Sequence, residues 1–211
     1  MERESMLKKL ELTFHNQGLR SYIELDLCAE CPRQDDKGCC GYYSPVFYPC
    51  DFAYLLQHKP EVLDYIFSLD NLTILDASVT VNNRPEGQSY RCNFHSKTGG
   101  CLLPQALRES VCRHFVCPGV AWEKENKLAH WKDFFAALTD YEIELNNRIA
   151  GILKEKGLSL REEKRRDEFM AELLILFEQE TATTAPFLAK CPPLEKYSFF
   201  RELQYGTDWP L

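Results

Sequence analysis

The clearest hydrophobic pattern in the chain lies between residues 126 and 156. Apolar side chains recur there at intervals of three and four, the spacing of one face of an α-helix, and only Glu142 interrupts that face. Gly157 is expected to end this long helix. Ser159 and Glu162 then have the S-x-x-E form of a capping box, which predicts a second helix as far as about residue 179. We expect the two helices to pack as an antiparallel hairpin.

Two weaker patterns occur near the beginning of the chain. Residues 5–17 place three apolar side chains at helical spacing and stop at Gly18, which predicts a short helix; the three are Leu7, Leu10 and Phe14. Residues 22–27 alternate between apolar and polar, which indicates a strand or an extended segment that leads to Cys28.

The middle and the end of the chain carry shorter signals. Two short helices are expected at residues 51–58 and from residue 60 to 69, with Asp51 as an N-cap and Pro60 in a first helical turn. The segment 181–198 is rich in proline and threonine, so we expect it to cross the surface before a short aromatic tail.

The remaining β signal predicts a single hairpin. Residues 73–81 are rich in β-branched side chains, and a turn-rich stretch separates them from a return strand at 89–94. The predicted fold is therefore mainly α with a small β-hairpin. In that fold a cysteine-rich module, residues 1–120, packs on a helical hairpin and tail, residues 121–211, as one globular unit.

Composition and charge narrow the choice of partners. The chain has 211 residues, with 25 Lys and Arg against 32 Asp and Glu, and its formal net charge is −7. This balance argues against broad binding to nucleic acid or to an anionic membrane. No apolar run approaches the roughly 18 residues of a membrane span, and the first residues lack the apolar core of a secretory signal. A cytoplasmic location is the expectation.

Ten cysteines stand out in a chain of this kind. Thiols in the cytosol are kept reduced, so a high density of cysteine favours metal ligation or redox chemistry over a disulfide framework. Disulfides or inert buried thiols are the alternative. Eight of the cysteines fall into two sets of four, and we identify them as candidate metal ligands: Cys28, Cys31, Cys39, Cys40, Cys92, Cys101, Cys112 and Cys117.

The spacing of the first set is informative. Cys28 and Cys31 form a C-x-x-C pair, whose tight turn can direct both thiolates toward one ion. Cys39 and Cys40 are adjacent, and neighbouring side chains point to opposite faces of an extended chain. This adjacency favours two nearby sites or one polynuclear centre. An iron–sulfur cluster fits it, and two Cys₄ zinc sites fit the count of eight equally well.

Other residues have weaker claims. Arg108 and Arg113 flank Cys112, where a cation would stabilise thiolates or balance the charge of a ligated centre, although an ordinary ion pair is the alternative for both. Aromatic neighbours of the cysteines could shield a cluster from water. Ligation by four further residues is conceivable but less favoured: Cys50, Cys191, His95 and His114.

The order of these motifs resembles the YkgJ-type family, the zinc- or iron-chelating proteins with a CxxCxxCC motif. The matching stretches are Cys28 to Cys40, then Cys92-Asn93-Phe94 with Gly99-Gly100-Cys101, then Arg108 to Arg113. The chain departs from the family pattern at three places: seven residues separate Cys31 from Cys39, Glu109 stands in place of proline, and His95 in place of leucine. The resemblance covers residues 28–117, less than half of the chain.

The resemblance implies that the protein binds iron, as an iron–sulfur cluster, or zinc. A related cysteine pattern in flagellin lysine N-methylases adds a protein methylase-like enzyme as a further alternative. A centre with an open coordination position would allow catalysis or electron transfer, whereas closed zinc sites would make a structural module for an unknown protein partner. The chain lacks a phosphate-binding glycine loop, a G-x-S-x-G elbow and an H-E-x-x-H motif, and the sequence leaves enzymatic activity undecided.

Overall fold

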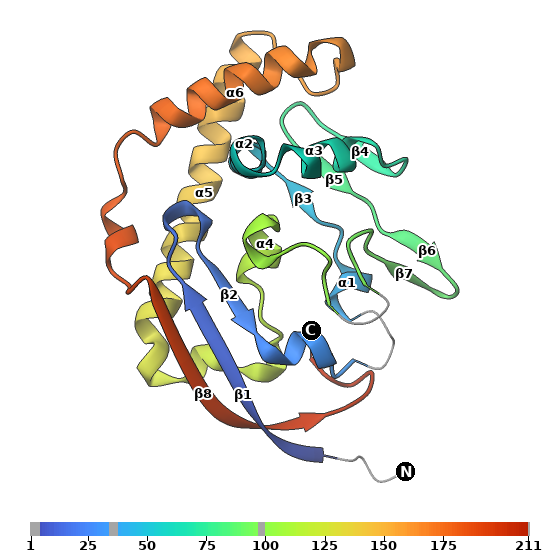
Figure 1. The fold of residues 1–211 in the computed structure, drawn as a ribbon, viewed down its shortest axis with the longest axis vertical. Coiled ribbons are helices and arrows are strands. Elements are labelled where there is room, and N and C mark those ends of the chain that lie inside the picture. The colour runs from blue at the N-terminus through green and yellow to red at the C-terminus, as the bar shows by residue number, and fades with distance from the viewer. Residues whose placement is uncertain (1–4, 34–37, 97–99, 211) are drawn as a thin grey trace.

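A computed structural model describes residues 5–33, 38–96 and 100–210. The long helix α5 (Ala129–Glu155) rises from the lower left toward the top of the view in Figure 1. This helix was predicted from its apolar face, and Gly157, with a φ of +68°, follows its end as expected. In the described part of the chain, no helix combines the length and the apolar character that crossing a membrane requires.

The next helix, α6 (Arg166–Glu180), begins later than the capping box predicts. The hydroxyl of Ser159 donates to Asp76 and accepts from the backbone N–H of Arg161, so it holds a turn rather than a helix start. In Figure 1, α6 passes across the C-terminal half of α5. The buried residues of α6 and of the C-terminal half of α5 belong to one core together with those of α2 and α3, so the two helices pack on these elements as well as on each other.

The N-terminal segment was predicted as a helix, and this prediction is wrong. Residues Ser5–His15 form strand β1, the centre of an antiparallel sheet in the order β2–β1–β8. The buried apolar residues of β1 alternate with period two, at Leu10, Leu12 and Phe14, whereas Leu7 is 68% exposed and does not belong to the buried face.

The partner of β1 comes from the other end of the chain. Residues Leu194–Gln204, expected as a surface tail, form β8, which pairs with β1 from Ser5↔Gln204 to His15↔Leu194. The shorter strand β2 (Tyr22–Leu25) lies on the other edge and leads toward Cys28, as its alternation predicts. These strands come from opposite sides of the expected boundary at residue 120, and that boundary stays a prediction.

Two further small sheets replace the single predicted hairpin. Strands β3, β5 and β4 form one antiparallel sheet, and β6 pairs with β7 in another. With these sheets the described fold is mixed α and β, which corrects the prediction of a mainly α fold. The strands are β3 (Val46–Phe47), β4 (Leu72–Ile74), β5 (Val79–Val81), β6 (Arg84–Glu86) and β7 (Ser89–Arg91).

The two short helices lie where the sequence predicts them, as α2 (Pro49–His58) and α3 (Pro60–Phe67). Asp51 is not the N-cap residue of α2. It lies in the first turn, where its carboxylate accepts a hydrogen bond from the backbone N–H of Tyr48 at 3.1 Å. The Asp51 side chain, which belongs to the first turn, therefore accepts a hydrogen bond from the residue that immediately precedes α2.

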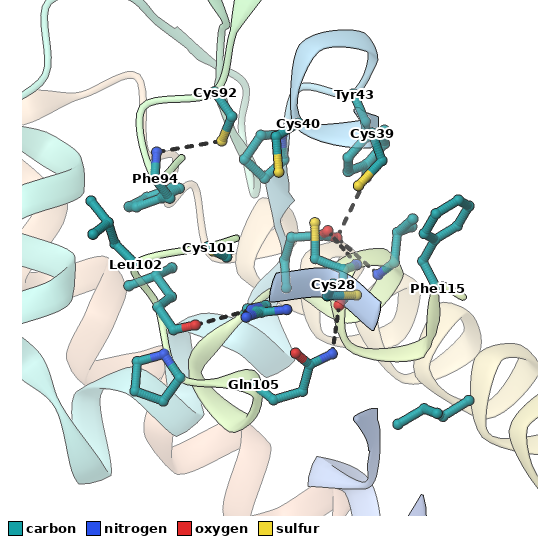
Figure 2. A pocket seen from close by; sticks show the side chains of 18 of the residues that line it. Cys28, Cys39, Cys40, Tyr43, Cys92, Phe94, Cys101, Leu102, Gln105 and Phe115 are labelled. Carbon is teal, nitrogen blue, oxygen red and sulfur yellow. Dashed lines mark hydrogen bonds between the residues drawn. The ribbon is translucent and has the colours of Figure 1, made fainter. Parts of the chain in front are cut away.

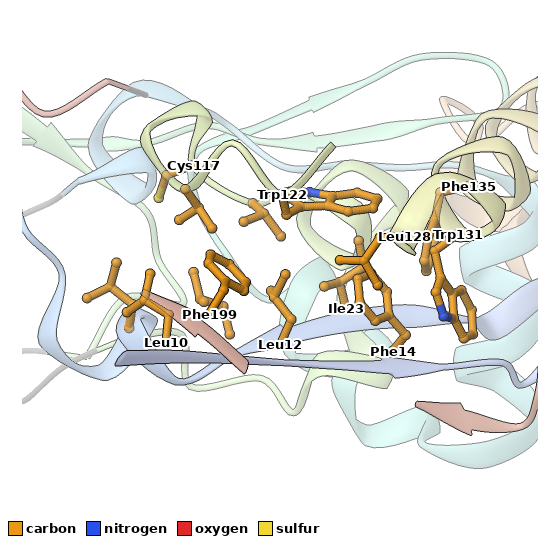
Figure 3. Packing of buried hydrophobic residues seen from close by; sticks show 14 of the residues in the cluster. Leu10, Leu12, Phe14, Ile23, Cys117, Trp122, Leu128, Trp131, Phe135 and Phe199 are labelled. Atoms are coloured by element: carbon orange, nitrogen blue, oxygen red, sulfur yellow. The ribbon is translucent and has the colours of Figure 1, made fainter. Parts of the chain in front are cut away.

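Two apolar cores share α5. The first lies against the β2–β1–β8 sheet and includes Phe14, Trp122 and Trp131 (Figure 3). The second joins α2, α3, α6 and the sheet that contains β3. The N-terminal half of α5 packs in the first core and the C-terminal half in the second, so this helix connects the two.

Glu142, the interruption of the apolar face, lies on α5 between the residues of the two cores. Its carboxylate pairs with the guanidinium of Arg113, which is fully buried, and accepts a hydrogen bond from the Ser110 hydroxyl at 2.6 Å. A second buried pair joins Arg20 to Asp51 at 2.6 Å. Buried charges are tolerated where they are paired and hydrogen-bonded, so both pairs fix the elements that carry them.

Candidate functional site

A single cavity of about 770 Å³ gathers cysteines from distant parts of the sequence (Figure 2). Seven of the eight predicted ligands line it, although they are spread between residues 28 and 117. These seven are Cys28, Cys39, Cys40, Cys92, Cys101, Cys112 and Cys117. The remaining one, Cys31, does not line the cavity.

The first segments reach the cavity through short helical turns. Cys28 lies in a 3₁₀ turn, Asp26–Glu30, directly after β2. Cys39 and Cys40 begin the short helix α1 (Cys39–Tyr42), which Gly38 precedes with a φ of +50°. Successive side chains on a helix are separated by about 100°, so adjacent cysteines need not point to opposite faces. Both line the same cavity, and the expectation drawn from an extended chain does not apply.

The middle segment is fixed by backbone contacts. The N–H of Cys92 donates to the carbonyl of Cys40 at 2.7 Å, which ties the strand end after β7 to α1. The Cys92 sulfur accepts a hydrogen bond from the N–H of Phe94 at 3.4 Å. Cys101 forms an isolated antiparallel bridge with His95. Backbone contacts thus tie Cys92 to α1 and Cys101 to His95 in the wall of the cavity.

The third segment depends on α4 (Ser110–His114) and on the loop before it. Glu109 caps α4, and its carboxylate accepts hydrogen bonds from the N–H groups of Cys112 at 2.7 Å and Val111 at 3.0 Å. The Gln105 carboxamide donates to the Cys112 carbonyl at 3.0 Å. These contacts hold Cys112 at the cavity wall.

The buried arginines support this segment from behind. Arg20 donates to the carbonyls of Ala106 at 2.7 Å and Arg108 at 2.6 Å, and Arg113 donates to the carbonyl of Ser21 at 2.7 Å. Arg108 lines the cavity as predicted, but Arg113 does not. Arg113 serves the ion pair with Glu142 instead, because its side chain points into the protein interior.

The other three cysteines are not among the residues that line the cavity. Cys31 is exposed, and its sulfur lies beside Gly38, where a Cβ atom would be 2.7 Å away. Cys50 is buried in the second core, and Cys191 is buried with its thiol directed at the carbonyl of His130 at 3.6 Å. Neither lines the cavity.

The two weaker histidine candidates also lie outside the set of lining residues. His114 packs on Phe135 with ring centroids 5.0 Å apart, and burial lowers its pKa well below the ordinary value. His95 is placed next to Cys101 by the bridge between them, and its ring nitrogen Nδ1 is buried.

The cavity disfavours isolated thiolates. Cys28 is exposed as a residue, but its sulfur faces the crowded cavity, where burial raises its pKa to about 12. Burial likewise raises the pKa of Cys92 and of Cys117 to about 11. The guanidinium of Arg108 opposes the rise in pKa at Cys28. Without a bound cation, these thiols are therefore protonated at neutral pH.

Glu109 is a functional candidate that the sequence reasoning missed. It lines the cavity, is only 1% exposed, and accepts a third hydrogen bond from the Tyr43 hydroxyl at 3.4 Å. Burial, with the nearby charge of Asp51, raises its pKa to about 7. A carboxyl group of this kind can give or take a proton near neutral pH. The only signal in the sequence is the acidic residue immediately before a short helix, which is an unspecific one.

The sulfurs surround the cavity rather than converge on one point. Within the described residues, no three or more His, Cys, Asp or Glu side chains are grouped so that they could hold a single metal ion. Aromatic side chains fill much of the remaining wall, and exposed apolar side chains form its rim. The aromatic lining residues are Tyr42, Tyr43, Phe47, Phe94 and Phe115, and the rim includes Leu102 and Val111.

Comparison with known proteins adds no assignment. No protein-family model, no curated protein and no solved structure matches this chain. The functional argument therefore depends on the geometry and chemistry of the cavity.

Proposed function

We propose that the protein binds a metal centre in the cysteine-lined cavity, an iron–sulfur cluster in preference to zinc. One observation carries the proposal: seven cysteines, spread between residues 28 and 117, line one cavity. Bringing that many thiols together has no evident value for packing, since an apolar side chain fills a core without the polar S–H group. A shared ligand is the simplest reason for their convergence.

The donor set suits metals that prefer thiolate. Zinc and iron–sulfur clusters are both held by cysteine sulfur, and binding requires the thiols to lose their protons. A bound metal cation would offset the negative charge of the buried thiolates, and Arg108 contributes a further positive charge to the same wall. The resemblance to the YkgJ-type cysteine pattern points in the same direction.

The distribution of the sulfurs favours a polynuclear centre over separate zinc ions. A tetrahedral zinc site needs four ligands that converge on one ion, whereas the metal atoms of a cluster take their ligands at separate points. The aromatic side chains in the wall would limit access of water to such a cluster, which is one of the factors that set its potential. In this proposal the protein is cytoplasmic, where thiols stay reduced.

Analysis of anaerobically purified protein tests the proposal directly. Iron, zinc and acid-labile sulfide are measured per chain, together with the visible spectrum. We expect a brown protein with nearly equal amounts of iron and sulfide. In Cys39→Ser and Cys112→Ser, which remove sulfurs from the cavity wall, the metal content should fall. Cys191→Ser is the matched control, because Cys191 is buried outside the cavity, and it should retain the metal.

Each other outcome has a definite meaning. A colourless protein with stoichiometric zinc that is lost in the two cavity variants would keep the metal site and replace the cluster with zinc. Equal metal content in all three variants and in the unchanged protein would refute a centre in this cavity. Absence of iron and zinc from protein that was purified and reconstituted anaerobically would refute metal binding itself.

A further inference from the structure

The segment after β8 returns to the loops that carry cysteines. In Figure 1 the C-terminus lies beside the turn that follows β2. The N–H of Gly206 donates to the carbonyl of Pro32 at 2.9 Å, and the guanidinium of Arg33 donates to the carbonyl of Trp209 at 3.1 Å. Pro32 and Arg33 directly follow Cys31. The segment from 205 to 210 is therefore joined by hydrogen bonds to the first cysteine loop.

The side chain of Trp209 reaches a second cysteine loop. It is 3% exposed, and its ring packs so closely on Gly119 that a Cβ atom there would lie 2.6 Å from a ring carbon. Gly119 is two residues after Cys117, and Trp209 and Cys117 belong to the same apolar core. Figure 3 shows Cys117 at one end of that core. Trp209 thus occupies the space behind the wall that Cys117 forms.

The indole N–H of Trp209 is a buried donor that lacks a well-formed bond. Among the described residues no acceptor meets hydrogen-bond geometry with it. The sulfur that the indole N–H approaches is that of Cys117. A buried donor without an acceptor costs free energy, and a thiolate is a better acceptor than a thiol. Ligation of Cys117 would therefore also satisfy Trp209.

We propose that Trp209 is a positioning residue for the cysteine cavity, which closes the wall behind Cys117 and ties the loop after Cys31 to the loop after Cys117. This role in shielding the thiol follows from the packing alone. Its extension to holding a metal ligand in place rests on the proposed function. The two cysteine loops are far apart in sequence, and the segment from 205 to 210 supplies contacts to both.

Alkylation of individual cysteines tests the shielding. Metal-free, reduced, full-length protein is treated with iodoacetamide, and mass spectrometry follows each cysteine over time. Trp209→Ala should raise the alkylation rate of Cys117 at least about tenfold, because it opens one wall of the site. Trp209→Phe keeps a ring over Gly119 and should restore most of the protection. Cys50, which is buried in the second core, is the internal control and should react at an unchanged rate.

Two results would overturn the shielding role. One is an unchanged rate at Cys117 in Trp209→Ala, and the other is an equal rise at Cys117 and Cys50, which would indicate general loosening of the fold. A second measurement addresses the metal: the rate at which EDTA removes metal from the loaded protein. We expect faster loss from Trp209→Ala than from Trp209→Phe. Equal rates in both variants and in the unchanged protein would overturn the positioning of the ligand.

The two proposals fail in different ways. If the unchanged protein binds no metal, the proposed function fails, and the alkylation rates still decide whether Trp209 shields Cys117. If metal is bound and Cys117 is equally protected in Trp209→Ala, the metal centre stands and the role of Trp209 is wrong.

Discussion

Glu142 shows how one buried residue secures the site at a distance. Its carboxylate lies between the two cores and pairs with Arg113 of α4, the helix that also carries Cys112. Arg113 in turn donates to the backbone of Ser21, just before β2. A buried charge that loses its partner is strongly destabilising, because it keeps its cost of desolvation without the attraction. The pair therefore fixes α4 relative to α5 and β2.

Replacement of Glu142 by alanine should lower the free energy of unfolding by about 3–5 kcal/mol, because Arg113 stays buried without its counter-ion. Urea unfolding followed by far-UV circular dichroism measures the change. Glu168→Ala is the control, since Glu168 pairs with Arg165 on the surface and its loss should lower the free energy of unfolding much less. Similar losses in the two variants would contradict the structural role given to Glu142.

Gly38 offers a second test at the scale of one residue. Its φ is +50°, and a Cβ atom would lie 2.7 Å from the Cys31 sulfur. Gly38→Ala should destabilise the protein by about 1 kcal/mol or more. It should also reduce the metal content, because the added methyl group, directly before Cys39, collides with the Cys31 sulfur. Gly87 has a similar φ of +61° with nothing within 4 Å, so Gly87→Ala should show the backbone cost alone.

Thermal unfolding and metal analysis separate the two effects of these glycine variants. Both variants should melt at a lower temperature than the unchanged protein. Only Gly38→Ala should lose metal, and equal metal content in both would show that the contact with Cys31 does not matter for the site.

At the scale of elements, local signals were sufficient for some predictions and insufficient for others. The long helix α5 is encoded in its own apolar spacing, so its position follows from the sequence. Strand β1 is different, because it needs β8, a partner near the other end of the chain, and no local pattern shows that pairing. Leu7 happened to complete a helical spacing with Leu10 and Phe14, which hid the alternation through Leu12.

The residues of the candidate site also differ in how far the sequence alone reveals them. A C-x-x-C pair and repeated cysteines are recognisable without a structure, so the sequence alone singled out the seven cysteines that line the cavity. Glu109 and Trp209 could not be found, because an acidic helix cap and a tryptophan near the chain end are common features. Their importance arises only from where the fold brings them.

The corrected assignment of β1 leads to a direct comparison of two leucines. Leu12→Ala should cost about 2–5 kcal/mol of stability, because Leu12 is fully buried in the first core. Leu7→Ala should change stability by less than about 0.5 kcal/mol, because Leu7 is exposed. Guanidinium unfolding of both variants measures the difference. A larger cost at Leu7 than at Leu12 would contradict the strand, because it would place Leu7 rather than Leu12 on the buried face.

At the scale of the whole molecule, α5 joins two cores that could otherwise unfold separately. The first core contains all three tryptophans of the chain, Trp122, Trp131 and Trp209. Tryptophan fluorescence therefore reports on the unfolding of that core alone. Far-UV circular dichroism reports on the helices of both cores. Because α5 and its buried ion pair connect them, we expect the midpoints of urea unfolding from the two probes to coincide.

Separate midpoints would show that the two cores are independent units, in spite of the helix they share. The variant Glu142→Ala provides a sensitive background for this test, since it weakens the connection between the cores. A single transition in the unchanged protein with two transitions in this variant would assign the cooperativity to the ion pair.

The pairing of β1 with β8 also has a consequence for the time course of biosynthesis. Strand β1 is made first, but the edge to which β8 adds stays uncovered until nearly all of the described chain has been translated. Contacts between residues so far apart in sequence slow folding, and an unpaired strand edge in the meantime can associate with other chains. A nascent chain of this protein would therefore depend on chaperones for longer than a helical bundle of equal length.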